Sequence, residues 1–273
     1  MRAADARRME VNRLKWDESV PLHRDSPVYD VPAFLAGRST LEPLEIAEVG
    51  TVRGRSLLHV QCHFGLDTLS WARRGARVTG VDFSPAAVRA AREMALQSGL
   101  PGRFVRSNVY DLRRNLKGKF DIVYTAKGAL CWLPDMAAWA ETLASFLRPG
   151  GRLYLLEDHP LSDLYGEDRR GGLRLEIPYF LGRAKREVFD GTYATSVRMR
   201  HRTSFMWIHP VSEVVSALAS AGLRLEFLHE FPFSYWKKFP SMRPRRGGGW
   251  ELPKGEAKLP LAYSLRAVRP RND

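Results

Sequence analysis

The stretch HVQCHFGLD, residues His59–Asp67, lies where a nucleotide-binding loop is expected in a protein of alternating strands and helices. The apolar run before it predicts a strand, and the residues after it predict a helix. A second predicted strand then ends on an acid, Asp82. This layout is that of a glycine-rich nucleotide loop, except that Gln61 and His63 stand where glycines are usual. Whether the loop binds a ligand therefore depends on what these two side chains do.

The composition is that of a soluble globular enzyme. The chain has 273 residues, of which 44% are hydrophobic and 27% charged, enough for one large domain or two small ones. Its apolar runs are shorter than the roughly 18 to 20 residues that span a bilayer, and residues 1–10 lack the apolar core of a secretory signal. Two cysteines, Cys62 and Cys131, are too few for a disulfide framework. We therefore expect a cytoplasmic protein that does not contact a membrane.

The chain is strongly basic, with a net charge of +13 and a pI near 10.1. Such a charge is compatible with a nucleic acid or another anionic partner. Most of the basic residues are dispersed among acids, which favours an ordinary arginine-rich surface. One cluster stands apart, because Trp236–Trp250 holds five cations and no acid. Its proline and glycine residues predict a loop.

Strands and helices alternate through the middle of the chain. Strands are expected over 56–61, 77–84, 102–111, 120–129 and 152–160, and helices over 66–76, 84–100 and 135–151. This alternation with short connections predicts parallel strands covered by helices on both faces. Such sheets bind ligands at the carboxyl ends of their strands. The rule selects the residues after each strand, namely 61–67, 82–83, 108–111, 125–128 and 157–159.

The two flanks of this region have a different character. Residues 1–50 carry aromatics among prolines and end in a predicted helix over 40–50, which indicates an N-terminal cap or lid. After Pro160 we expect extended strands over 171–180 and 191–210, a helix and a strand within 210–231, and a last strand over 259–268. Residues 51–273 are thus predicted to form the main domain, with 161–206 as an insertion on its substrate side.

Residues 56–159 resemble the class I S-adenosylmethionine-dependent methyltransferases. The resemblance is carried by LLHVQCHFGLDTLSWARRGARVTGVDFSPAAVRAAR, FDIVYT and LRPGGRLYLLE. The first motif of that family has an acid and then alternate glycines, whereas this chain has His59, Gln61 and His63 at those positions and retains Gly65. A bacterial subset with similar QCHFGLDTLS and WLPD segments looks like small-molecule methyltransferases or methyltransferases of unassigned substrate.

The resemblance implies an α/β fold with a Rossmann-like, seven-stranded, mostly parallel sheet and helices on both faces. An N-terminal cap and a β-rich insertion after the fifth strand would be added to it. The implied cofactor is S-adenosylmethionine. Asp82 would accept hydrogen bonds from both ribose hydroxyls, and Phe83 would pack on the adenine or in the core. Asn108 and Val109 would read the adenine edge through a side chain and a backbone N–H.

The methionine part of the cofactor would lie beside the first loop. Gly65 and Asp67 open the following helix, where backbone N–H groups suit a polar ligand, although Asp67 can equally serve as a helix cap. Gln61 and His63 would offer side chains in place of glycine N–H groups, or would satisfy the loop itself. Thr125 follows the fourth strand and is expected to lie along the methionine part.

The methyl acceptor is expected at the end of the fifth strand. His159 is our candidate general base there, since histidine titrates near neutral pH. The sulfonium is already an activated methyl donor, so proximity and orientation can supply much of the rate without a base. The candidate acceptor contacts are Trp16, His23, Tyr29, Glu157, Tyr193 and His209. These side chains can also simply cover the core. No histidine pair has metal-ligand spacing with supporting cysteines or carboxylates, so we expect no metal.

The predicted function is methyl transfer to a small molecule, with N, O, S or C open as the acceptor atom. One alternative is an RNA or DNA methyltransferase that uses the basic loop over 236–246. The lack of an NPPY or DPPY motif, and of a Pro-Cys context at Cys131, counts against the best-known nucleic-acid methylations. A second alternative is a non-catalytic binding protein on a methyltransferase fold, prompted by the missing glycines. A nicotinamide enzyme is weaker still, because G-x-G-x-x-G is absent.

Overall fold

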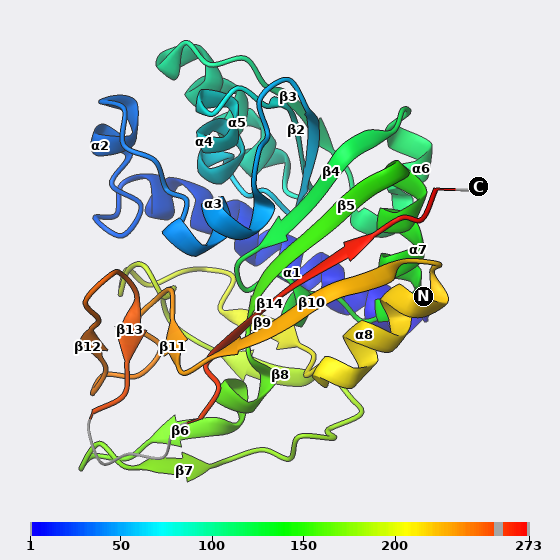
Figure 1. Ribbon diagram of the computed structural model, residues 1–273. Coiled ribbons are helices and arrows are strands. Elements are labelled where there is room, and N and C mark those ends of the chain that lie inside the picture. The colour runs from blue at the N-terminus through cyan, green and yellow to red at the C-terminus, as the bar shows by residue number, and fades with distance from the viewer. Residues whose placement is uncertain (1, 254–258, 272–273) are drawn as a thin grey trace.

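The computed structural model describes residues 2–253 and 259–271 and is built on a seven-stranded sheet (Figure 1). The strands are β1 Ser56–Val60, β2 Arg77–Asp82, β3 Arg103–Arg106, β4 Phe120–Ala126, β5 Leu147–Asp158, β10 Arg224–Phe231 and β14 Ala262–Val268. Their order is β10-β14-β5-β4-β1-β2-β3. Strands β1 to β5 are parallel, and β14 pairs antiparallel with both β5 and β10. The predicted Rossmann-like, mostly parallel sheet is confirmed.

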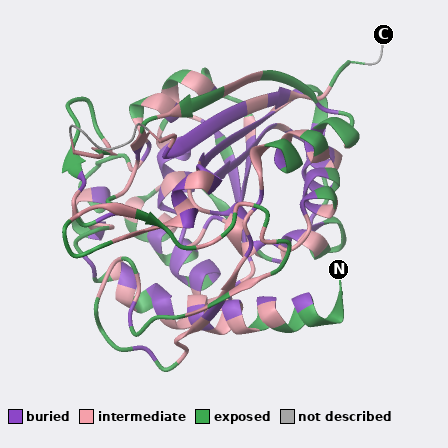
Figure 2. Ribbon diagram, turned by 90° about the horizontal axis from the view of Figure 1, so that it is seen from below, coloured by how far each residue is buried: buried purple, intermediate pink, exposed green. Residues whose placement is uncertain are grey.

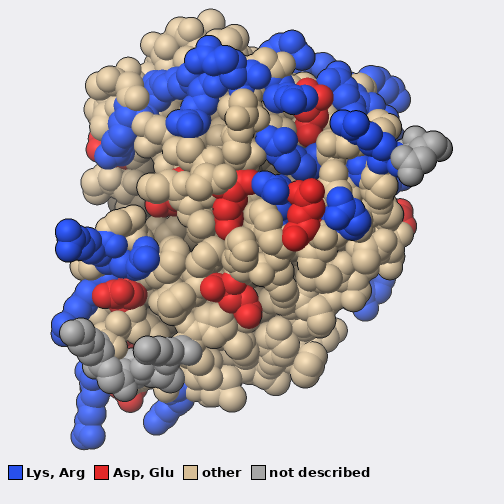
Figure 3. Space-filling model, in the orientation of Figure 1, with Lys and Arg blue, Asp and Glu red and all other residues tan. Residues whose placement is uncertain are grey.

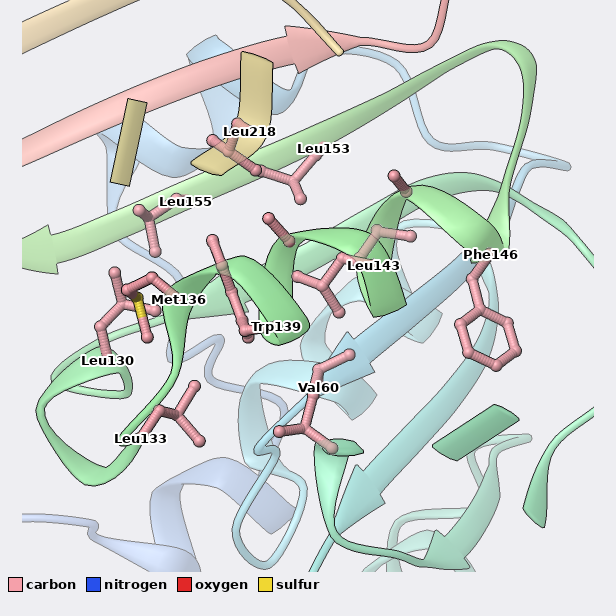
Figure 4. Packing of buried hydrophobic residues seen from close by; sticks show 14 of the residues in the cluster. Val60, Leu130, Leu133, Met136, Trp139, Leu143, Phe146, Leu153, Leu155 and Leu218 are labelled. Atoms are coloured by element: carbon pink, nitrogen blue, oxygen red, sulfur yellow. The ribbon is translucent and has the colours of Figure 1, made fainter. Parts of the chain in front are cut away.

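Helices cover both faces of this sheet because neighbouring strand residues point to opposite sides. They are α3 Pro43–Val49, α4 Leu66–Arg73, α5 Pro85–Ser98, α6 Leu112–Asn115, α7 Met136–Phe146 and α8 Val211–Ser220. Leu57 faces the core beneath α3 and α4, whereas Leu58 faces the core beneath α6, α7 and α8. On α7, Met136, Trp139 and Leu143 have the spacing of one helix face and point toward β5 and α8 (Figure 4).

Side chains cap the start of two of the covering helices, α5 and α7. Ser84 accepts a hydrogen bond from the Ala87 N–H, Pro85 is the first residue of α5, and Gly99 ends it in the left-handed conformation. Asp135 caps α7 in the same way through the Ala138 N–H. The third strand is shorter than expected, since β3 ends at Arg106 and a 3-10 turn occupies Val109–Asp111.

The N-terminal region is a long helix, α1 Ala3–Arg24, followed by the short α2 Val31–Leu35. The sequence did not predict α1. Its buried positions follow a helical spacing but include polar residues, namely Asp5, Asn12, Lys15, Ser19 and His23, so no apolar stripe marks it. Helix α1 passes behind the sheet in Figure 1 and packs against α5 and β9, Thr203–Met206.

Short hairpins follow the fifth strand, as expected for a β-rich insertion. Strand β6 Tyr165–Glu167 pairs with β7 Leu173–Leu175, and β8 Lys185–Val188 pairs with β9. The regular pairing is briefer than the extended strands expected over 171–180 and 191–210. A separate three-stranded sheet contains β11 Phe233–Ser234, β12 Arg243–Pro244 and β13 Trp250–Glu251.

Burial separates the central sheet from this periphery. Buried residues gather in the central sheet and on the inner sides of its helices, while the outlying loops are largely exposed (Figure 2). Among the described residues, no helix is both long and apolar enough to cross a membrane.

Candidate active site

A cavity of about 1240 Å³ opens at the carboxyl edge of the sheet. The ends of β1, β2, β4 and β5 line it, together with side chains from α1 and from the segments 38–42, 189–193 and 235–238. The predicted site residues in its lining are Trp16, His23, Tyr29, Gln61, His63, Gly65, Asp67, Asp82, Phe83, Asn108, Val109, Glu157, Tyr193 and His209. Ligand cavities usually hold roughly 300 to 1000 Å³, so this one has room for two small ligands.

Two predicted site residues lie outside the lining of this cavity, and we correct their assignment. Thr125 is fully buried inside β4. His159 lies just after the end of β5, where its Nδ1 accepts the Leu161 N–H and its Nε2 contacts Glu230 at 2.8 Å. Burial also lowers the pKa of His159. Both ring nitrogens are occupied away from the cavity, a geometry that does not favour His159 as the general base.

The first loop keeps the course of a glycine loop although two glycines are missing. Gln61 and His63 adopt φ angles of 62° and 49°, in the left-handed region that glycine normally occupies. Such residues cost about 1 to 3 kcal/mol each unless their surroundings hold them. Here Gln61 Nε2 donates to the Ala129 carbonyl at 2.8 Å, and the His63 N–H donates to Asp82 Oδ2 at 2.8 Å. These bonds fix the loop in the strained conformation.

Gly65 is required by packing as well as by its backbone conformation. It lies at the start of α4 with a φ of 85°. A Cβ atom built on it would lie 2.8 Å from the Phe104 ring and 3.0 Å from Ala91. The missing side chain therefore lets the loop rest on β3 and α5, which carries the start of α4 to the cavity wall.

Asp82 occupies the position expected of a ribose acceptor. It is the last residue of β2 and is buried, with Oδ1 accepting the Ser84 N–H at 2.9 Å and Oδ2 accepting the His63 N–H. Burial raises the pKa of Asp82 to about 6, although these N–H bonds act in the opposite direction. Each carboxylate oxygen has a further lone pair, so Asp82 can accept two more hydrogen bonds from a ligand.

The three other residues assigned to the adenosyl end also reach the cavity. Phe83 and Val109 line it with apolar surface. Asn108 uses its Oδ1 to accept the Tyr110 N–H at 3.1 Å and thereby begins the 3-10 turn after β3. The side chain of Asn108 thus shapes this wall, which leaves an adenine edge to be read by backbone groups.

Asp67 belongs to a buried ionic cluster that the sequence did not reveal. Its Oδ1 accepts the Thr40 hydroxyl, and its Oδ2 lies 3.5 Å from Lys127 Nζ. Lys127 also lies 3.1 Å from Oε2 of the fully buried Glu45. Burial opposes the charge of Lys127, but the surrounding carboxylates outweigh it and raise its pKa. The sequence feature that could have indicated this cluster is Lys127, a lysine directly after the buried strand β4.

Aromatic rings from distant parts of the chain meet above the first loop. Trp16 of α1 lies edge-on to His63, with ring centroids 5.2 Å apart, and to Trp132, at 5.3 Å. His23 Nδ1 and His63 Nε2 are 3.0 Å apart and share a hydrogen bond. Burial lowers the pKa of His23 to about 4, so both imidazoles are neutral at physiological pH. Helix α1 and the loop thus form one continuous wall.

The same wall continues across the cavity through the insertion. His23 stacks on Tyr29 with centroids 5.1 Å apart, and the Tyr29 hydroxyl is hydrogen-bonded to that of Tyr193. The Tyr193 ring lies 6.2 Å from Trp236. Trp132 and Trp236 were not among the predicted site residues.

Glu157 and His209 line the cavity but are occupied by the protein itself. Glu157 Oε2 accepts the N–H groups of Ala129 and Leu130 at 2.7 and 2.8 Å, so it holds the turn after β4 in place. His209 uses both ring nitrogens, on Glu213 at 3.0 Å and on the Leu133 carbonyl at 2.7 Å. Both residues therefore hold neighbouring parts of the cavity wall in place through hydrogen bonds within the protein.

The basic loop over 236–246 is partly folded back on the protein. Lys238 is buried beside Asp158 and Asp163. Lys237 lies over the ring of Trp250, and Arg245 over that of Phe233. On the face seen in Figure 3, lysine and arginine gather mainly over the part of the molecule that carries α4 and α5.

Within 2–253 and 259–271, no cluster of three His, Cys, Asp or Glu residues could hold a metal ion. Cys62 and Cys131 are both free.

The strand order β3-β2-β1-β4-β5 followed by an antiparallel pair, with an acid ending β2 beside a cavity, is the arrangement expected from the resemblance to the class I S-adenosylmethionine-dependent methyltransferases. Residues 58–153 match the family model described as "Methyltransferase domain". This match over residues 58–153 confirms the class that was recognised from the sequence.

Relatives and solved structures agree with this class. Ubiquinone biosynthesis O-methyltransferase of Xanthomonas euvesicatoria is 38% identical over 118 residues, which are 42% of this chain and 49% of that protein. The Cronobacter sakazakii protein of the same name is 31% identical over 51% of this chain and 53% of its own length. The chain thus spans about half the length of the curated relatives it matches. An S-adenosylmethionine-dependent methyltransferase from Mesorhizobium loti shares the fold, with a TM-score of 0.58, 20% identity, and coverage of 86% and 100% of the two chains.

Proposed function

We propose that this protein transfers the methyl group of S-adenosylmethionine to a hydroxyl group on a small, planar acceptor. The observation that carries the proposal is one cavity with Asp82 at its adenosyl end and an aromatic wall at the other. Oxygen as the acceptor atom is supported by the O-methyltransferase names of the curated relatives. When bound, S-adenosylmethionine would supply a methyl group already activated by the positive sulfonium.

The residues at the adenosyl end fit this cofactor. The free lone pairs of Asp82 suit the two ribose hydroxyls, and Phe83 and Val109 offer apolar surface to the adenine. Gln61 Oε1 is buried and has no hydrogen-bond partner among the described residues. A buried acceptor without a partner costs about 1 to 3 kcal/mol. The ammonium of the methionine part would remove this cost by donating to Gln61.

The acceptor end is built by the two segments that flank the central domain. Trp16 and Tyr29 come from residues 1–50, and Tyr193 comes from the insertion over 161–206. We propose that these two segments cover the acceptor end of the cavity. The flat faces of their aromatic side chains would position a planar acceptor and exclude water. Holding the two reactants in line supplies much of the rate. The two free cysteines support a cytoplasmic location.

Calorimetry with S-adenosylhomocysteine tests the proposal. We expect the wild-type protein to bind it, and Asp82→Ala to bind about tenfold more weakly or worse, because hydrogen bonds to a charged group contribute about 1.5 to 3 kcal/mol. Asp111→Ala is the matched control, since Asp111 is an acid with a half-exposed side chain close to the end of β3. Circular dichroism checks that both variants fold. Failure of the wild-type protein to bind would instead support a non-catalytic protein on this fold.

A further inference from the structure

Buried polar side chains gather at the end of β5, on the acceptor side of the cavity. Asp158 is the last residue of β5, and its two carboxylate oxygens lie 3.0 and 3.1 Å from Nε1 of Trp236. Lys238 Nζ lies 3.8 Å from Asp158 Oδ2 and also contacts Asp163. The side chains of Asp158 and Lys238 are 13% and 9% exposed, so this ion pair is held inside the cavity wall.

Asp158 shares its surroundings with a hydroxyl that lacks a partner. Tyr235 Oη is buried and has no hydrogen bond of standard geometry within the described residues, but it lies close enough to the Asp158 carboxylate to interact with it. A Cβ atom placed on Gly128 would lie 3.8 Å from Asp158 Oδ2 and 4.0 Å from Tyr235 Oη. The carboxylate and the hydroxyl therefore both approach one point directly after β4. Because residue 128 is a glycine, no side chain fills that point, and a polar group of a ligand can occupy it.

We infer that Asp158 is the general base for methyl transfer and that Tyr235 hydrogen-bonds the acceptor oxygen; this rests on the proposed function. Asp158 takes the proton of the acceptor hydroxyl. A lone pair of that oxygen forms the bond to the methyl carbon, and the methyl–sulfur bond breaks with its electron pair left on sulfur. The products are the methyl ether and S-adenosylhomocysteine, and Asp158 returns the proton to solvent. Trp236 and Lys238 are positioning residues that orient the carboxylate.

The electrostatics of the cluster suit this role. Burial raises the pKa of Asp158, and Lys238 opposes the rise. The titratable groups around Asp158 are Glu157 on the same strand, Asp163 on the following 3-10 helix, Tyr235 and Lys238 on the loop before β12, Tyr263 on β14, and Cys131. A carboxylate with a raised pKa is a stronger base than an ordinary aspartate but stays ionised beside a cation. The rate should therefore fall, as the pH is lowered, at pH values above the usual pKa range of an aspartate.

Phenol and 4-nitrophenol are the acceptor probes for the test. Phenol must lose its proton to react, whereas about half of 4-nitrophenol is already ionised at neutral pH and most of it is ionised in the alkaline part of the range. Single-turnover methyl transfer from S-adenosylmethionine is measured by mass spectrometry from about pH 5 to about pH 9. We expect Asp158→Asn to slow methylation of phenol about 100-fold or more and to abolish the acid limb, while slowing methylation of 4-nitrophenol less than about tenfold.

Binding measurements separate chemistry from structure. In calorimetry on the complex with S-adenosylhomocysteine, Tyr235→Phe should weaken phenol binding about five- to tenfold, and Asp158→Asn should leave S-adenosylhomocysteine binding within about twofold. Glu230→Gln, which alters the partner of His159, is the control and should leave both rates unchanged.

The possible results lead to distinct conclusions. Equal losses of rate on the two probes in Asp158→Asn would mean that Asp158 is structural, and the inference would be wrong. A wild-type protein that binds S-adenosylhomocysteine but methylates neither probe would also overturn the inference, while the proposed cofactor role would stand. If the protein does not bind S-adenosylhomocysteine at all, the proposed function itself fails.

Discussion

At the scale of single residues, the first loop shows how tertiary contacts override a backbone preference. Glycine is usual at the positions of Gln61 and His63 because it takes positive φ without cost. Both residues nevertheless take positive φ here, since the Ala129 carbonyl and the Asp82 carboxylate hold them. With Gln61 and His63 in place of glycines, the loop contributes two side chains to the cavity wall. The surrounding hydrogen bonds offset the backbone strain of these two residues.

Two substitutions of Gln61 separate its strain from its binding role. Gln61→Gly and Gln61→Ala both remove the amide, but only alanine keeps a Cβ at positive φ. We expect Gln61→Gly to be about 1 kcal/mol more stable than Gln61→Ala in urea denaturation. Both should bind S-adenosylhomocysteine about five- to tenfold more weakly than wild type, because the buried Oε1 is lost. Wild-type affinity in either variant would show that the amide serves the loop alone.

The rule that ligands bind after strand ends predicted most of the residues that line the cavity. It failed at the end of β5, because the sequence placed the end of that strand too late. Asp82 and Gln61 were found because parallel strands deliver their carboxyl ends to one edge. His159 was predicted from a strand expected to run to residue 160. The strand instead ends at Asp158, and His159 caps a 3-10 helix with its ring turned to Glu230. Asp158 falls within the range 157–159 that the same rule selected, but it was not among the named candidates, although its side chain lines the cavity.

At the scale of elements, α1 is the part of the fold that its sequence concealed. Its buried face is polar and is satisfied by partners far away in the chain. Asn12 is buried and forms two hydrogen bonds with the backbone of Phe205 in β9, through Nδ2 at 2.7 Å and Oδ1 at 2.8 Å. The pattern of residues 1–24 alone cannot predict hydrogen-bond partners that lie nearly 200 residues later in the chain. The central helices, by contrast, were visible because apolar side chains recur with helical spacing.

Removing the Asn12 side chain should detach α1 from the insertion. We expect Asn12→Ala to lower the free energy of unfolding by about 1 to 3 kcal/mol, because two partly buried backbone groups of Phe205 lose their partner. Arg7→Ala, at an exposed position of the same helix, should change it by less than about 0.5 kcal/mol. Urea denaturation followed by tryptophan fluorescence measures both. An Asn12→Ala protein as stable as Arg7→Ala would mean that α1 is held by its other contacts.

At the scale of the whole molecule, the charge of +13 admits a nucleic-acid partner but does not require one. Three of the five cations in Trp236–Trp250 pack against acids or aromatic rings, which leaves Arg243 and Arg246 as the freer ones among the described residues. The cavity is also walled by side chains from three separate segments, a geometry that fits a small acceptor better than a polymer.

We therefore expect weak and unspecific binding to RNA. A short labelled RNA should bind only at low salt, with an affinity that falls steeply as salt is raised. Methyl groups from labelled S-adenosylmethionine should not enter total RNA above background. Arg243→Ala combined with Arg246→Ala should reduce the salt dependence of binding without changing S-adenosylhomocysteine affinity. Salt-resistant binding together with methylated RNA would instead establish the nucleic-acid alternative.

The sequence by itself determined the central sheet, its helices and the end of the cavity that Asp82 lines. Apolar periodicity, caps such as Ser84 and Gly99, and acids at strand ends are local features, and the connection rules of parallel sheets fix how they assemble. Only the tertiary structure decided the acceptor end. Asp158, Tyr235 and Gly128 lie close together because β5, β4 and the loop before β12 converge, and α1 joins the same cavity wall through its polar contacts with β9. Pairings between such distant residues leave no periodic trace in the chain, so folding alone brings that chemistry together.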